Sequence, residues 1–255
     1  MTPPREEDFF IGWASPSKRL AGFLCLISAF LLAVFIGVSV AVGASRPDPG
    51  PGALRGDWGR QTVTGVMHMN PYPTVIVTKG SKRIPEGHTL MLSASSKRGV
   101  QGRANKLDGK LVEVSGIILK RGTLDMLQVR GGRNGVKAAK GDVPQTAPDE
   151  LLGRWRLTGE VCDGKCLAGA MRPGSGLAHK ACAILCLTGG VPPVLVTTKP
   201  VEGTQFVMLG DKDGLPLGDR LNDFVGQLAM FEGDLVRRGD ILIFNADLET
   251  GQFIK

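Results

Sequence analysis

Aromatic residues are scarce in this 255-residue chain, which contains a single tyrosine and has 5% aromatic residues in all. Glycine is abundant, at 36 residues. Much glycine with few aromatic side chains favours short strands joined by tight turns over long helices. The composition therefore points to a mostly β protein.

Signatures of the common enzyme classes are also lacking. The sequence has no Gly-x-Ser-x-Gly nucleophile motif, no His-Glu-x-x-His zinc motif, no phosphate-binding loop and no dinucleotide fingerprint after a strand. These absences favour a non-enzymatic protein over a hydrolase or a nucleotide-dependent enzyme, and they leave enzyme activity itself undecided.

Charge is absent from residues 20–44, an almost wholly apolar run. A helix of this length spans a bilayer with some tilt. A cleaved signal peptide is the alternative, although its apolar region would be shorter and nearer the amino terminus. Lys18 and Arg19 precede the run, whereas only Arg46 follows it closely. The positive-inside rule then predicts a cytoplasmic segment 1–19, a single-pass span of the inner (cell) membrane, and a periplasmic or extracytoplasmic remainder.

After a linker the chain repeats one pattern. A Thr-Gly pair occurs at Thr64-Gly65 and again at Thr158-Gly159. A proline followed by a β-branched run and a lysine occurs at 73–79 and at 193–199. Each copy ends in two strand-like runs split by a basic-Arg-Gly turn, at 110–127 and 227–244. Units of about five short strands usually close into barrels, and the pattern favours an OB-like barrel.

The predicted layout has six segments. They are the cytoplasmic segment 1–19, the transmembrane helix 20–44, a linker 45–56, a first OB-like β domain 57–135, a linker 136–150, and a second OB-like β domain 151–255 with a Cys/His insertion 161–187.

The two halves differ in charge. Residues 46–149 hold 17 basic and 8 acidic side chains, whereas residues 150–255 hold 11 basic and 13 acidic ones. In an exported protein the basic first domain would face anionic lipid or an acidic partner rather than nucleic acid, or present a solvated basic surface with no dedicated partner.

The insertion holds four of the five cysteines and one of the three histidines. The offset between the copies is 94 residues at Thr64 and Thr158 but 120 at Pro73 and Pro193, so about 26 residues have been added to the second copy. Residues 177–187 are predicted to be a short helix that stops at two glycines. On that helix, His179, Cys182 and Cys186 would share one face.

Three uses of this set stay open. Cys162, Cys166, Cys182 and Cys186, with His179 as a further ligand or supporting group, would suit zinc or an iron–sulfur cluster. The same four cysteines would alternatively form two disulfides in an exported loop. As a third use they would exchange thiols and disulfides, with neighbouring lysines favouring thiolate.

A smaller metal candidate is the run Met67, His68 and Met69, whose soft ligands suit copper(I). Strand alternation would place His68 on the face opposite both methionines, which favours methionines in the core.

We therefore expect a membrane-anchored, exported accessory protein of a redox or metalloprotein system. Its insertion would bind a metal or cluster, or engage another membrane or periplasmic protein. The alternatives are a structural or docking subunit with two disulfides, and a periplasmic thiol-disulfide oxidoreductase.

Overall fold

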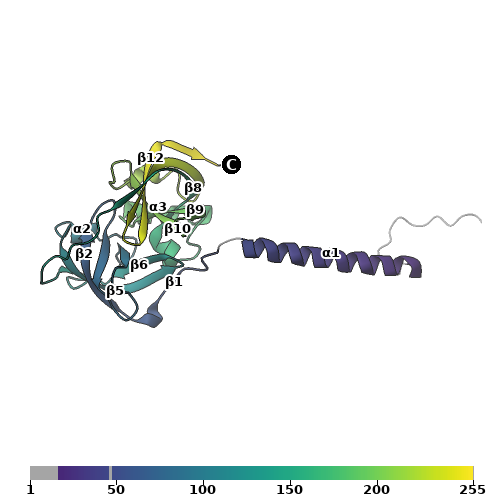
Figure 1. Cartoon of the computed structure of the whole chain (residues 1–255), viewed down its shortest axis with the longest axis horizontal. Coiled ribbons are helices and arrows are strands. Elements are labelled where there is room, and N and C mark those ends of the chain that lie inside the picture. The colour runs from purple at the N-terminus through teal and green to yellow at the C-terminus, as the bar shows by residue number, and fades with distance from the viewer. Residues whose placement is uncertain (1–16, 46–47, 255) are drawn as a thin grey trace, which may run out of the picture. The chain divides into compact units, whose positions relative to one another are not determined.

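The computed structural model describes residues 17–45 and 48–254 (Figure 1). The chain divides into two compact units, Met1–Asp48 and Pro49–Lys255, each of which is described by itself. Most of the expected cytoplasmic segment, and Arg46 with its neighbour Pro47, lie outside the described residues.

The first unit contains the helix α1 (Lys18–Ser45). Its stretch Leu20–Ser45 has a mean hydropathy of 2.7 in its most apolar window, and none of that window is buried in protein. The expected span at 20–44 is thus confirmed as one helix that is long and apolar enough to cross a membrane.

The second unit is mostly β, as predicted, and begins with a sheet of seven strands. Its five main strands are β2 (Gln61–His68), β3 (Thr74–Lys79), β4 (Thr89–Ser93), β5 (Leu111–Arg121) and β6 (Leu124–Val129). β2 pairs with β3 and β5, β3 with β4, β4 with β6 in parallel, and β6 with β5. The five pairings therefore form a closed circuit.

Shorter elements complete this half. They are β1 (Ala53–Leu54), the 3-10 turn η1 (Gly56–Trp58), α2 (Gln101–Ala104) and β7 (Val136–Ala138). Both β1 and β7 pair with β5, so the segments expected as linkers, 45–56 and 136–150, each add a short strand to the sheet.

The second sheet is a closed barrel. Its strands are β8 (Glu150–Asp163), β9 (Pro193–Val201), β10 (Thr204–Asp211), β11 (Leu228–Arg238) and β12 (Ile241–Phe253), and the turn η4 (Gly218–Leu221) precedes β11. β8 pairs with β9 and β11, β9 with β10, β10 with β12 in parallel, and β12 with β11. This is the pairing order of β2 to β6.

The pairing register also agrees between the two sheets. Gly116 pairs with Val129 in the first sheet, and Gly233 pairs with Ala246, 117 residues later in both strands. A side chain at Gly116 or at Gly233 would overlap a carbonyl of the neighbouring strand. Because only glycine permits this approach, the matched glycines follow from strand geometry.

The two sheets share a hydrophobic core besides having one each. The shared core includes Met91 and Met126 from the first sheet and Phe206 and Met208 from the second. Tyr72 adds its hydroxyl as acceptor for the N–H of Leu217, 3.2 Å away. The two halves therefore pack as one compact unit.

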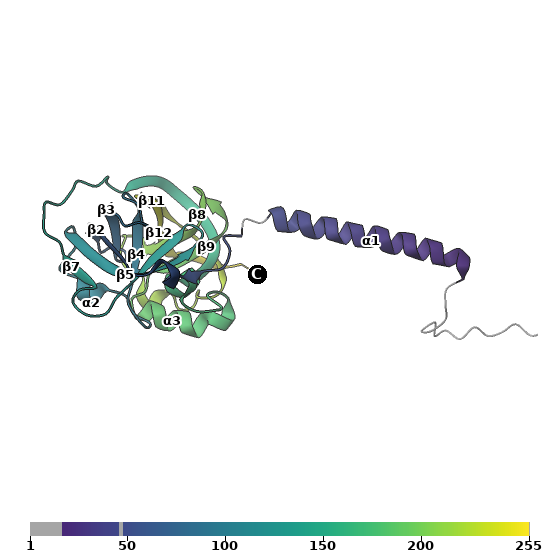
Figure 2. The same cartoon turned by 90° about the horizontal axis from the view of Figure 1, so that it is seen from below.

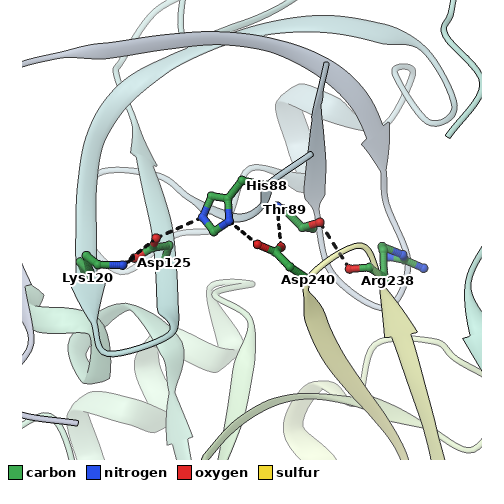
Figure 3. Close-up of polar contacts among 6 residues, drawn as sticks. All are labelled: His88, Thr89, Lys120, Asp125, Arg238 and Asp240. Atoms are coloured by element: carbon green, nitrogen blue, oxygen red, sulfur yellow. Dashed lines mark hydrogen bonds and ion pairs between the residues drawn. The ribbon is translucent and has the colours of Figure 1, made fainter. Parts of the chain in front are cut away.

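A histidine between two aspartates joins the two sheets (Figure 3). The ring of His88, next to β4, lies 3.1 Å from Asp125 of β6 and 2.5 Å from Asp240 in the β11–β12 turn. Asp240 also accepts the Thr89 N–H at 2.8 Å. Burial alone would lower the pKa of His88, but the hydrogen bonds to both carboxylates outweigh it and raise the pKa to about 9.

We predict that this contact makes stability fall at alkaline pH. A histidine with a raised pKa contributes its full stabilisation below the unfolded value of about 6.5 and loses it as pH rises through about 9. Because the Asp240 side chain is half exposed to water, the free energy of unfolding should fall by between about 1 and 3 kcal/mol. Urea unfolding of the full chain in uncharged detergent at pH 6, 8 and 10 measures it.

The matched variant is His88→Gln, which should unfold at lower urea than the wild type at pH 6 and at nearly the same urea at pH 10. Asp240→Asn retains an oxygen for the Thr89 N–H and should reduce the pH dependence in part. If the wild type and His88→Gln lost the same stability between pH 6 and pH 10, this role of His88 would be contradicted.

Candidate metal centre

The site begins where β8 ends, at two adjacent residues that point to opposite faces of the strand. Cys162 belongs to the core that the two sheets share, and its thiol donates to Glu160 Oε1 at 3.3 Å. Asp163 faces the insertion and is 0% exposed. Strand alternation therefore turns Cys162 away from the other cysteines and directs Asp163 toward them.

The insertion, predicted at 161–187, fills residues 164–192, because residues 161–163 continue β8 and β9 begins only at Pro193. At the equivalent place β2 and β3 are joined by only residues 69–73. It forms the short helical segment η2 (Cys166–Ala170), the 3-10 turn η3 (Leu177–His179) and the helix α3 (Lys180–Thr188). The predicted helix at 177–187 is confirmed, and Figure 2 shows α3 on the outside of the β unit.

Close backbone packing holds both ends of the insertion. Gly169 has φ 122° and lies directly against the backbone of Gly52 and Ala53. Gly189, beyond α3, lies against the Lys97 carbonyl, and its own carbonyl accepts the Gly99 N–H at 2.8 Å. The glycines expected only to stop the helix also let a loop of the first sheet reach it.

Two groups of candidate ligands meet at Cys166. Cys166, His179 and Cys182 offer ligand atoms within 4.8 Å of one another, as do Asp163, Cys166 and Cys186. The structure thus brings together four of the five predicted residues, all except Cys162. The exposed Met171 adds a thioether 3.5 Å from the Cys182 Sγ.

Asp163 organises the centre through both carboxylate oxygens. Oδ1 accepts the backbone N–H of Cys166 at 2.8 Å, and Oδ2 lies 2.9 Å from Nε2 of His179. His179 is only 4% exposed, so the contact is shielded from water. A carboxylate on a histidine ring nitrogen fixes the ring orientation, as carboxylates do beside metal-binding histidines.

Two lysines place positive charge beside the sulfurs. Lys97, after β4, donates to the Cys182 Sγ at 2.6 Å, and this hydrogen bond raises the pKa of Lys97. Lys165 is buried, and its ammonium donates to the carbonyls of Ala94 at 2.6 Å and Ser96 at 2.5 Å. Burial lowers the pKa of Lys165. Lys180, which precedes Cys182 by two residues, donates to the Asp223 carbonyl at 2.9 Å.

The pKa values of the Cys166 and Cys186 thiols are shifted in opposite directions. The hydrogen bond to Cys186, together with burial, raises the pKa of Cys166, while the same bond lowers the pKa of Cys186. Burial raises the pKa of Cys162 well above its ordinary value, in keeping with a neutral thiol in the core.

No disulfide is present, since all five cysteines are free. Cys166 Sγ and Cys182 Sγ lie 4.0 Å apart, about twice the length of a sulfur–sulfur bond. The two-disulfide alternative is therefore not formed in this structure, where Cys162 contacts none of the other three.

The Met67, His68 and Met69 run follows the expected alternation. Met67 is fully buried in the core of the first sheet and Met69 packs against that core. His68 carries a buried Nε2 without a hydrogen-bond partner, and burial lowers its pKa. Within the described part of the chain, His68 belongs to no group of His, Cys, Asp or Glu side chains with metal-ligand spacing.

Sequence reasoning missed Asp163 and Lys97. Asp163 follows Cys162 directly, and strand alternation was the signal that the two could not both face the insertion. Lys97 comes from the first sheet, 85 residues before Cys182, and no sequence pattern links them.

Comparisons with known proteins identify no relative: no family model matches the chain, and neither the curated proteins nor the solved structures gave a match. The site has to be interpreted from its own geometry.

We predict that, among the four cysteines of the β unit, Cys182 reacts first when the reduced, metal-free chain is alkylated. Cys182 is partly exposed, whereas Cys162, Cys166 and Cys186 are 1–3% exposed. Buried thiols react only when the structure opens locally, so the difference in rate should exceed about tenfold. Peptide mass spectrometry over a time course of iodoacetamide treatment measures it. Modification of Cys162 as fast as Cys182 would contradict the placement of Cys162 in the shared core.

Proposed function

We propose that the insertion binds one zinc ion through Cys166, Cys182, Cys186 and His179. The observation that carries the proposal is the distance of 4.0 Å between Cys166 Sγ and Cys182 Sγ. Two sulfurs bound tetrahedrally to zinc at about 2.3 Å lie about 3.8 Å apart. These two sulfurs therefore need almost no movement to bind one ion, and Cys186 reaches it from the second group that meets at Cys166.

Charge supports a divalent ion. Three thiolates and Asp163 bring four negative charges to a largely buried site, and Lys97 and Lys165 bring two positive ones. A divalent cation makes the sum zero, which removes the cost of an uncompensated buried charge. A monovalent copper ion would leave the site with one uncompensated negative charge.

An iron–sulfur cluster fits less well. Such clusters use four cysteines in the common types, and the fourth cysteine here, Cys162, lies in the shared core. Cysteines on a four-iron cluster also bind separate irons, so their sulfurs lie further apart than those of Cys166 and Cys182.

For the whole protein we propose a membrane-anchored accessory protein of a metalloprotein system. α1 would be retained as an inner-membrane anchor, with the amino end cytoplasmic and residues after 45 exported. The common pairing order and the glycine register support two OB-like barrels related by duplication. On that view the second barrel gained the insertion as its distinctive feature, and a membrane or periplasmic protein would be its partner.

A thiol–disulfide exchange role is the second candidate. It is favoured by the same pair, because Cys166 Sγ and Cys182 Sγ lie 4.0 Å apart and Cys182 is partly exposed. Closing that pair into a disulfide would move the sulfurs together by about 2 Å.

Metal analysis of variants tests the zinc site. The full chain, purified in uncharged detergent without chelator, should contain about one zinc per chain. Cys182→Ser and Cys186→Ser should each lose most of the metal, because a hydroxyl is a poor zinc ligand at neutral pH. Elemental analysis by inductively coupled plasma mass spectrometry reports zinc, iron and copper together.

Cys162→Ala is the matched control, since it removes a nearby cysteine that is not one of the proposed ligands. Its zinc content should equal that of the wild type. Loss of metal in Cys162→Ala alone would refute the ligand set. A metal-free wild type with a readily reduced bond between Cys166 and Cys182 would favour the exchange role instead.

A further inference from the structure

A cavity of about 530 Å³ opens beside the sulfur site. Its lining includes Cys166, Cys186 and Met171, together with Ser96, Lys97 and Arg98 of the loop after β4. Lys165 and Gln128 complete its polar lining, and no carboxylate contributes to it. A cavity of this size accommodates a small metabolite.

The loop is held in a strained conformation at this cavity. Ser96 has φ 60°, in the left-handed region that non-glycine residues rarely adopt. The buried Lys165 ammonium binds the carbonyl of Ser96, and the packing of Gly189 on Lys97 fixes the next residue. Strain that is maintained by surrounding contacts is typical of binding sites. Here it places Arg98 at the cavity.

Arg98 is the unused cation of the site. Lys97 and Lys165 are engaged by Cys182 and by two carbonyls. Within the described residues, the Arg98 guanidinium has no hydrogen-bond or ion-pair partner, and neither has the Gln128 amide. A planar guanidinium with its donors free matches carboxylate and phosphate groups.

We propose that this cavity binds the carboxylate or phosphate group of a small organic anion, which Arg98 and Gln128 hold beside the sulfur site. Lys97 and Lys165 add positive potential, and the lack of carboxylates removes the repulsion that would exclude an anion. The proposal deepens the proposed function, because the anion would lie next to the zinc ion, and it rests on the zinc site for that adjacency alone.

Equilibrium dialysis tests the cavity with two probes, labelled succinate for carboxylates and labelled inorganic phosphate for phosphates. The full chain is used in uncharged detergent at low salt. In one series the chain is metal-free and reduced. In the other series, which uses succinate, it is loaded with zinc. We expect saturable binding of at least one probe, at about one per chain, and tighter succinate binding after zinc removes the negative charge of the thiolates.

Arg98→Gln should weaken binding about tenfold, equivalent to about 1.4 kcal/mol. The matched control is Lys82→Gln, which removes one exposed positive charge outside the cavity and should leave the affinity unchanged. Equal effects of the two variants, or no saturable binding of either probe, would overturn the proposal. Binding that depends on Arg98 in a chain that takes up no zinc would support the anion site while refuting the metal site.

Discussion

The carboxylate of Asp163 is the interaction on which the site depends. A carboxylate fully removed from water is costly unless each oxygen has a partner, and here one oxygen takes the Cys166 N–H and the other the His179 ring. These bonds tie together the end of β8, the start of η2 and the end of η3, which leads into α3. The strand and two segments of the insertion are thereby brought to one point before any ion is considered.

The first sheet takes part in a site that the second sheet carries. Lys165 of the insertion donates to carbonyls of the first sheet's loop, and Lys97 of that loop donates to Cys182. Neither sheet alone presents both lysines to the sulfurs. The shared core and the His88 contact between the sheets therefore also maintain the electrostatics of the site.

Much of the architecture was readable from local patterns. The apolar run, the repeated strand runs and the helix before Gly189 each follow from neighbouring residues, and the structure has elements at all three. The structure brings Cys166, His179, Cys182 and Cys186 together, and helical spacing fixes the face of three of them. Cys162, the fifth residue of the predicted set, lies apart from them because strand alternation decides where its side chain points. Lys97 and the cavity depend on contacts between distant segments, which no local pattern encodes.

The protein contacts that hold the insertion in place bear on what loss of the metal would do to the fold. Small zinc modules without a core unfold when the ion is removed, because ligand bonds replace the missing hydrophobic burial. In this protein each sheet has its own buried core, and Asp163, Lys165 and the close-packed glycines hold the insertion in place through protein contacts. Loss of the proposed zinc ion would then leave uncompensated negative charge at the site while both sheets stay folded.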